Sequence, residues 1–161
     1  MAIVNKKGTI NLDGLDQDTL IMPNAKTSKG ALRVSIDTLE INATDDDTST
    51  YRIARVPSNA VLESITIKND AITGGNDFFL GFYDINDGVA IDADALLGTT
   101  SLASAGDIDG LGSIDIANFG KEVWELAGLD KDPNKLVDIV LTGNTVGTAT
   151  GTVTAIAKYT L

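Results

Sequence analysis

The residues best able to do chemistry in this sequence of 161 residues are aspartates, and they gather in three short stretches: Asp45 to Asp47, Asp84 to Gly88, and Asp107 to Gly110. Carboxylates bind hard cations such as calcium, and a pair of them can act as acid and base in glycoside hydrolysis. Both kinds of site need a defined spacing. The spacing therefore decides whether these stretches predict a site.

The stretch Asp84-Ile85-Asn86-Asp87-Gly88 comes nearest to a calcium loop. An EF-hand loop has glycine at its sixth position and a bidentate glutamate at its twelfth, whereas here Gly88 is fifth and Ala95 is twelfth. The stretch from Asp107 to Gly110 is incomplete in the same way. Aspartate and glycine are also the residues that turns require, so we interpret both stretches as solvated turns.

Asp45, Asp46 and Asp47 place three like charges side by side. They repel one another unless a cation or a basic partner compensates. We favour a solvated loop tip, with a bound cation or a partner contact as the alternative. No local motif fixes a separation between two carboxylates, so a hydrolase with paired acidic residues has no support beyond their number.

Histidine and cysteine do not occur in the sequence. Imidazole bases, thiolate nucleophiles, disulfides and His or Cys metal ligands are therefore excluded, and with them most common catalytic arrangements. We expect a protein that is not an enzyme, with no catalytic, cofactor-binding or metal-binding residue.

The net charge is −11, from 12 Lys and Arg against 23 Asp and Glu. A field of this sign repels phosphate, so we expect neither nucleic acid nor an anionic membrane as a partner. The basic residues Arg52, Arg55 and Lys68 are spread along expected strands without forming a stripe. No apolar stretch follows Lys6 and Lys7, so we expect no signal peptide, and no run of roughly 18 apolar residues predicts a membrane span.

Apolar residues that alternate with polar ones predict most of the secondary structure as strands. The strand at 32–41 is expected to carry a bulge, because its apolar period slips by one residue after Ile36. The strand at 78–83 is apolar on both faces and should be central, with Gly81 indicating either close packing of a neighbouring ring or a local bulge. The other expected strands cover 51–56, 61–68, 136–142 and 152–161, with short pieces at 89–91 and 114–116.

Two short helices are expected between these strands. Asp92 can cap a single turn through Leu97, and a second helix fits 121–127, where Gly128 would end it. Trp124, the only tryptophan, is interpreted as a core residue and not as a platform for a ligand.

The fold class predicted is mainly β: an antiparallel sandwich, jelly-roll-like, with one or two short helices and an extended N-terminal arm. Residues 1–30 form the arm and residues 31–161 the sandwich domain. The arm is either an unattached terminus or a segment that docks on a neighbour. The last strand reaches the end of the sequence with Tyr159 and Leu161 inward, so trimming that end should damage the fold.

Three stretches resemble a family of small structural proteins of tailed bacteriophages, of the head decoration or cement type. They are Tyr51-Arg52-Ile53-Ala54-Arg55-Val56-Pro57 with Ala60-Val61-Leu62, then Val123-Trp124-Glu125-Leu126-Ala127-Gly128-Leu129, and then Gly151 to Tyr159. The resemblance lies in a strand ending in Arg-Val-Pro, a short helix ending at glycine and a Thr-rich last strand.

This resemblance implies a virion protein on the capsid surface, made in the host cytoplasm, that binds the major capsid protein where its subunits meet. It implies a homo-oligomer, with a trimer favoured. The arm would then extend onto the capsid or an adjacent copy. The alternatives are a tail- or neck-associated virion component and a carbohydrate-binding or adhesive sandwich, although aromatic residues make up only 5% of the chain.

Overall fold

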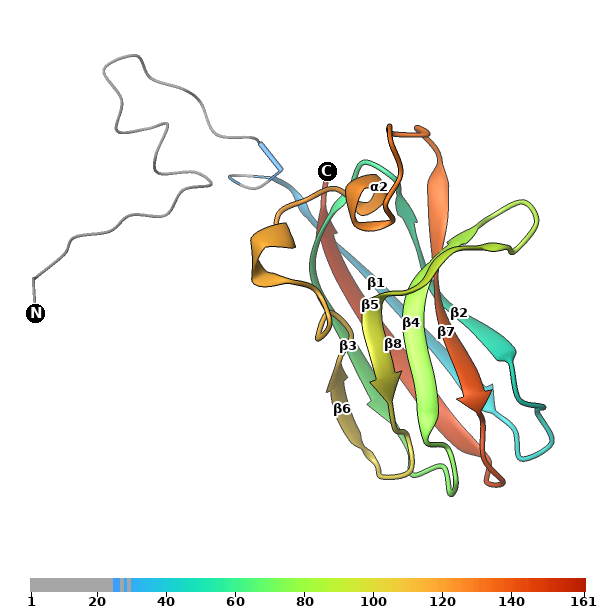
Figure 1. Cartoon of the computed structure of the whole chain (residues 1–161). Coiled ribbons are helices and arrows are strands. Elements are labelled where there is room, and N and C mark those ends of the chain that lie inside the picture. Colours follow the sequence, from blue (N-terminus) through green and yellow to red (C-terminus); the bar gives the residue numbers. More distant parts are fainter. Residues whose placement is uncertain (1–24, 27, 29) are drawn as a thin grey trace, which may run out of the picture.

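The computed structural model describes residues 25, 26, 28 and 30–161, which form a sandwich of two antiparallel sheets (Figure 1). The arm predicted for residues 1–30 lies almost entirely outside the described residues. The sandwich itself runs from Leu32 to Thr160.

Each sheet has four strands, and every strand pair is antiparallel. The first sheet has the order β1 (Leu32–Ile41), β8 (Gly151–Thr160), β3 (Val61–Asn69) and β6 (Gly106–Asp109). The second has the order β2 (Ser49–Pro57), β7 (Leu136–Thr145), β4 (Asp77–Asp84) and β5 (Ala90–Thr100). Successive strands alternate between the two sheets, except that β4 and β5 form a hairpin within the second sheet. This is the strand order of an eight-stranded jelly roll. The predicted fold class is confirmed.

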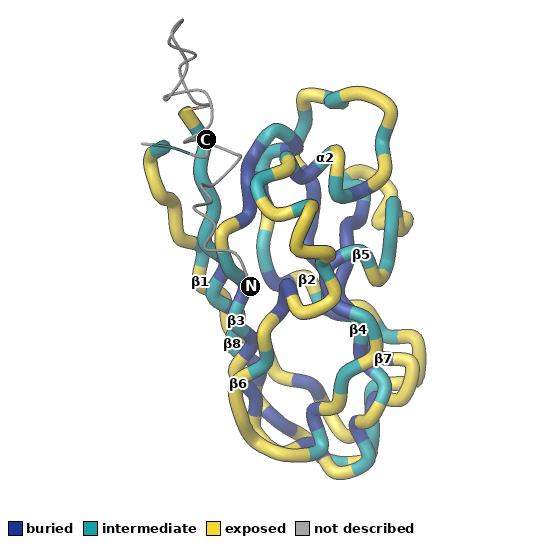
Figure 2. Tube along the Cα trace, turned by 60° about the vertical axis from the view of Figure 1, so that its left-hand side comes forward, coloured by how far each residue is buried: buried dark blue, intermediate teal, exposed yellow. Residues whose placement is uncertain are grey.

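The core lies between the two sheets and is filled from their inward faces (Figure 2). Phe78, Leu80 and Phe82 of β4 and Ile139 and Leu141 of β7 are fully buried there. The expectation that 78–83 is a central strand is confirmed, because β4 lies between β7 and β5.

Gly81 marks the place where β5 crosses β4. A Cβ atom at this position would lie 2.1 Å from the carbonyl oxygen of Asp92 and 2.4 Å from that of Ala93. The pairing jumps there from Phe82 opposite Asp92 to Leu80 opposite Leu97. Of the two alternatives predicted at Gly81, the local bulge is confirmed, and the atoms that approach this residue belong to the backbone of β5 and not to a ring.

The helix predicted from Asp92 to Leu97 is wrong, because these residues belong to β5. Their irregular pairing with β4 buries Leu96 and Leu97 in succession, a spacing that strict alternation would not show. Long-range packing on β4 outweighs the local capping signal.

The bulge predicted in β1 is also wrong. Its register with β8 runs without a shift from Leu32 opposite Thr160 to Ile41 opposite Gly151. Ile41 is buried, so the unbroken alternation turns the three apolar residues of the other parity, Leu32, Val34 and Ile36, outward.

The helix predicted at 121–127 is present as α2 (Val123–Leu126), with a reciprocal capping box between Glu122 and Glu125. Its neighbour η1 (Ile116–Asn118) is a 3-10 turn, where a strand piece was predicted. Trp124 is half-buried and donates its indole N–H to Oε2 of Glu122 at 2.8 Å, so the prediction of a core residue is wrong.

Within the described part of the chain no helix is long and apolar enough to cross a membrane.

Candidate functional site

The loop from Asp84 to Gly88 is a turn held by its own carboxylates. Oδ1 of Asp84 accepts the N–H of Asn86 at 2.8 Å, and Oδ1 of Asp87 accepts the N–H of Val89 at 2.9 Å. Oδ2 of Asp84 pairs with Nζ of Lys135, and this hydrogen bond lowers the pKa of Asp84 below its ordinary value. The carboxylates that suggested a cation loop are engaged with protein groups.

The stretch predicted as a turn at 107–110 is mostly strand β6, which pairs with β3. Asp107 binds Nζ of Lys68 on that neighbour at 2.5 Å. Oδ1 of Asp109 accepts the N–H of Leu111 at 3.0 Å. A strand of four residues with aspartates in it gave no periodic signal in the sequence, so it was missed.

The acidic cluster at 45–47 also makes contacts within the chain. Oδ2 of Asp45 accepts the hydroxyl of Tyr51 at 2.9 Å, and Oδ1 of Asp47 accepts the N–H of Val146 at 3.1 Å. Burial, and then the hydrogen bond to Asp45, raise the pKa of Tyr51 to about 12. Among the described residues, no group of three or more acidic side chains converges as a metal site would require.

Asp138 is the one charged side chain that is buried within the described part of the chain, with 2% exposure. It lies on β7 directly opposite Arg55 of β2. Nε and Nη2 of Arg55 donate to its two oxygens at 2.5 and 2.9 Å, and Nη1 of Arg52 approaches at 3.4 Å. These arginine hydrogen bonds lower the pKa of Asp138, although burial opposes them.

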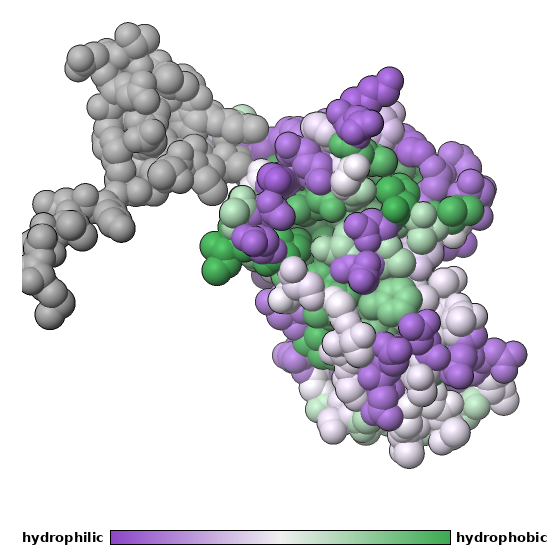
Figure 3. All heavy atoms as spheres, in the orientation of Figure 1, coloured by the Kyte–Doolittle hydropathy of each residue, from purple (hydrophilic) through white to green (hydrophobic). Residues whose placement is uncertain are grey.

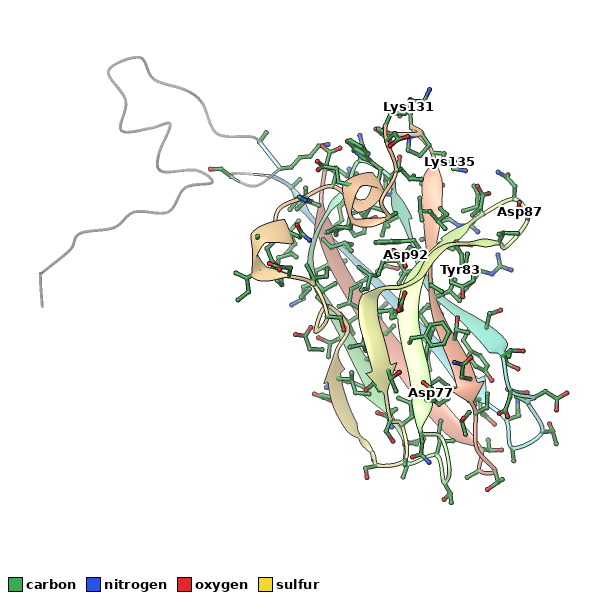
Figure 4. The ribbon with its side chains drawn as sticks, viewed as in Figure 1. Asp77, Tyr83, Asp87, Asp92, Lys131 and Lys135 are labelled. Atoms are coloured by element: carbon green, nitrogen blue, oxygen red, sulfur yellow. The ribbon has the colours of Figure 1, made fainter. Side chains whose placement is uncertain are left out.

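The outer face of the second sheet around Asp138 is polar and shallow. The hydroxyls of Tyr83 and Thr142 share a hydrogen bond of 2.7 Å, and a hollow of about 290 Å³ separates this face from the 84–88 loop. Figure 4 places Tyr83, Asp87 and Lys135 at the same end of the sandwich, with Asp77 at the other end. Tyr83, Asp87 and Lys135 each bind another group of the chain. The ion pairs of Asp138 with Arg55 and of Lys135 with Asp84 connect β7 with β2 and with the 84–88 loop.

Among the acidic residues that the structure describes, Asp92 has a raised pKa, because burial disfavours its charged form and Asp94 lies nearby. The hollow on that side is lined by Asp77, Asp94 and Asn144, but not by Asp92. Asp92, the carboxyl group with the raised pKa, therefore does not share this hollow with a second carboxylate.

Exposed apolar residues form the surface features that the sequence did not predict. Ile116 and Phe119 are 88% and 42% exposed beside η1. On the side that Figure 3 shows, hydrophobic residues gather in the half of the sandwich that carries α2, with polar residues between them. Leu32, Val34 and Ile36 form a separate stripe on β1, with 57%, 53% and 66% exposure.

No family model matches the sequence, and neither does any curated protein sequence. Among the solved structures that share its fold are two from phage capsids. A chain in the capsid of Ralstonia phage GP4 superposes with a TM-score of 0.60 at 11% identity, covering 87% of this chain and 88% of that one. A chain in the capsid asymmetric unit of cyanophage Pam1 superposes with a TM-score of 0.52 at 15% identity, covering 82% and 86%. These matches show a fold shared with chains found in phage capsids.

Proposed function

We propose that this protein is a structural component of a phage virion, which binds the outer surface of the capsid and stabilises it as a decoration or cement protein. The observation that carries the proposal is the jelly roll itself, which covers more than four fifths of the chain and of its two capsid-derived counterparts. Because a fold alone does not fix a function, the role needs a direct test.

The polar groups of the sandwich are consistent with a rigid body that acts through its surfaces. Asp138 is held by Arg55, and Asp84 by Lys135. Groups engaged in this way brace neighbouring strands and the loop, and they are not poised as nucleophiles or bases. We therefore propose a protein without catalytic activity.

The proposed partner is the major capsid protein, contacted where its subunits meet, with three copies of this chain at each position. The structure indicates where the N-terminal part joins the sandwich. Nζ of Lys26 lies 2.6 Å from Oε1 of Glu122 and from the carbonyl oxygen of Asn59, and the hydroxyl of Thr160 donates to the carbonyl of Lys26 at 2.7 Å. Lys26 is thus fixed beside α2 and the end of β8.

The test is co-sedimentation with empty shells assembled from the major capsid protein of the same genome. The proposal predicts saturable binding at a fixed ratio of copies to capsid subunits, and a higher unfolding temperature of the shells. Shells that bind no protein, or bind it without saturation, would refute the capsid role. Binding to tail structures or to glycans instead would favour the virion or adhesive alternatives.

The arm is tested by deletion of residues 2–24, which leaves the contacts of Lys26 in place. We expect a folded sandwich with unchanged circular dichroism that no longer sediments with shells. The matched control is Lys26→Gln in the full chain, which removes the ion pair with Glu122 but keeps the arm. Full binding by the deletion variant would show that the sandwich alone makes the contact.

A further inference from the structure

Strand β1 is an edge strand with a free side. Its ten residues pair with β8 without a bulge, and within the described residues no strand pairs with its other side. The N–H of Thr38 donates to Oδ1 of Asp37 at 2.8 Å, so this main-chain donor uses a side chain where a neighbouring strand would supply a carbonyl. In Figure 2 most of this strand is exposed.

The outer face of the same strand is apolar. Leu32, Val34 and Ile36 are each more than half exposed, and Ile156 of β8 lies directly opposite Ile36. Single exposed apolar residues are ordinary, but a row of them on a long, regular edge strand favours pairing with another strand.

The charged residues of β1 indicate that the partner strand is β1 of a second copy. Charged residues usually protect an edge from pairing, yet Arg33 and Asp37 stand at equal distances on either side of Ser35. When β1 pairs antiparallel with its own copy about Ser35, Arg33 of each copy faces Asp37 of the other. Val34 of each copy then faces Ile36 of the other, so both faces match.

Neighbouring registers lose this match. An axis at Val34 places Arg33 opposite Ser35, and an axis at Ile36 places Arg33 opposite Leu39. An axis at Arg33 or at Asp37 sets two like charges opposite each other, which is destabilising. Only the axis at Ser35 satisfies the charges and the apolar residues together.

We propose that β1 pairs with β1 of a second copy about a twofold axis through Ser35, which joins the two first sheets into one continuous sheet. The contact is isologous, because each copy contributes the same residues. It involves neither a capsid nor a threefold axis, so it can hold or fail independently of the proposed capsid role. If the chain also forms trimers, this contact links one trimer to the next.

The first test is the native mass of the full chain, measured by light scattering over a range of concentrations. Arg33→Asp alone and Asp37→Arg alone each set like charges opposite each other, so each is expected to halve the mass found for the unmodified chain. The double variant Arg33→Asp/Asp37→Arg restores the opposite charges and should restore the mass. Lys121→Asp, at an exposed loop position, makes the same change in net charge as Arg33→Asp and should leave the mass unchanged.

The second test uses the lack of cysteine in the chain. Directly opposite residues of antiparallel strands have Cα atoms about 4.5 to 5.5 Å apart, within the range of roughly 4.4 to 6.8 Å that a disulfide spans. Ser35→Cys should therefore give a covalent dimer on mild oxidation, whereas Ser104→Cys, on an exposed loop, should not. Equal cross-linking of the two variants would overturn the proposal, as would masses that the charge reversals leave unchanged.

Discussion

At the scale of single residues, the acidic side chains that first suggested a binding site turn out to brace the fold. Their abundance was visible in the sequence, but their partners were not, because each partner depends on strand register. Asp138 shows how far the sequence alone can predict such a contact. An aspartate within the apolar run 137–141 indicates a buried charge that must be compensated. Only the pairing of β2 with β7 identifies Arg55 as the compensating group.

The Asp138 contact makes a prediction about acid stability. Asp138→Asn should lower the free energy of unfolding at pH 7 by about 2 kcal/mol, because hydrogen bonds to a charged group are lost. Since Arg55 lowers the pKa of Asp138 in the folded chain, this contribution is present above the unfolded pKa of about 3.9 and is lost as pH falls through the folded value. Urea unfolding should therefore show a smaller difference in free energy of unfolding between the variant and the unmodified chain at pH 3 than at pH 7.

The control is Asp87→Asn, which removes a charge from an exposed position in the 84–88 loop. At pH 7 it should lower the free energy of unfolding by less than Asp138→Asn does. A difference between Asp138→Asn and the unmodified chain that is the same at pH 7 and pH 3 would contradict the account of this ion pair.

Tyr51 makes a prediction at the alkaline end. Its pKa of about 12 means that the folded chain retains this proton after an unfolded chain, with a tyrosine pKa of about 10, has lost it. The stabilisation of the folded chain by the protonated Tyr51 hydroxyl is therefore complete below about pH 10 and is lost between about pH 10 and 12. The difference in ultraviolet absorbance between the unmodified chain and Tyr51→Phe should titrate near pH 12. A midpoint near pH 10 would show that Tyr51 is not held as described.

At the scale of elements, period-two patterns located most of the long strands, and Gly128 as a helix end located α2. The same reasoning failed for β5 and β6, whose irregular or short pairing leaves no period in the sequence. It also misplaced a bulge in β1, because outward-facing apolar residues look the same as inward-facing ones until a second sheet covers one face.

The crossing of β5 over β4 makes a prediction at this scale. Gly81→Ala should destabilise the chain by about 3 kcal/mol, because its Cβ would meet the backbone of β5, which cannot yield as a flexible side chain can. Gly106→Ala is the control, since nothing lies within 4 Å of a Cβ placed there. Thermal unfolding should show a large shift for the first variant and almost none for the second. Equal shifts would refute the close crossing.

At the scale of the whole molecule, sequence reasoning predicted a mainly β sandwich but not the connection of its strands. The order of strands in each sheet depends on contacts between residues far apart in the chain, such as β1 with β8. That order is also what links this protein to capsid chains with which it shares at most 15% identity. The proposed role therefore follows from the arrangement of the whole chain and its surfaces.

The most direct test of that role is an electron cryomicroscopy reconstruction of shells prepared with and without this protein. The account predicts added density of the size and shape of the sandwich on the outer surface, in groups of three where capsid subunits meet. Identical reconstructions, or added density at the tail alone, would contradict it.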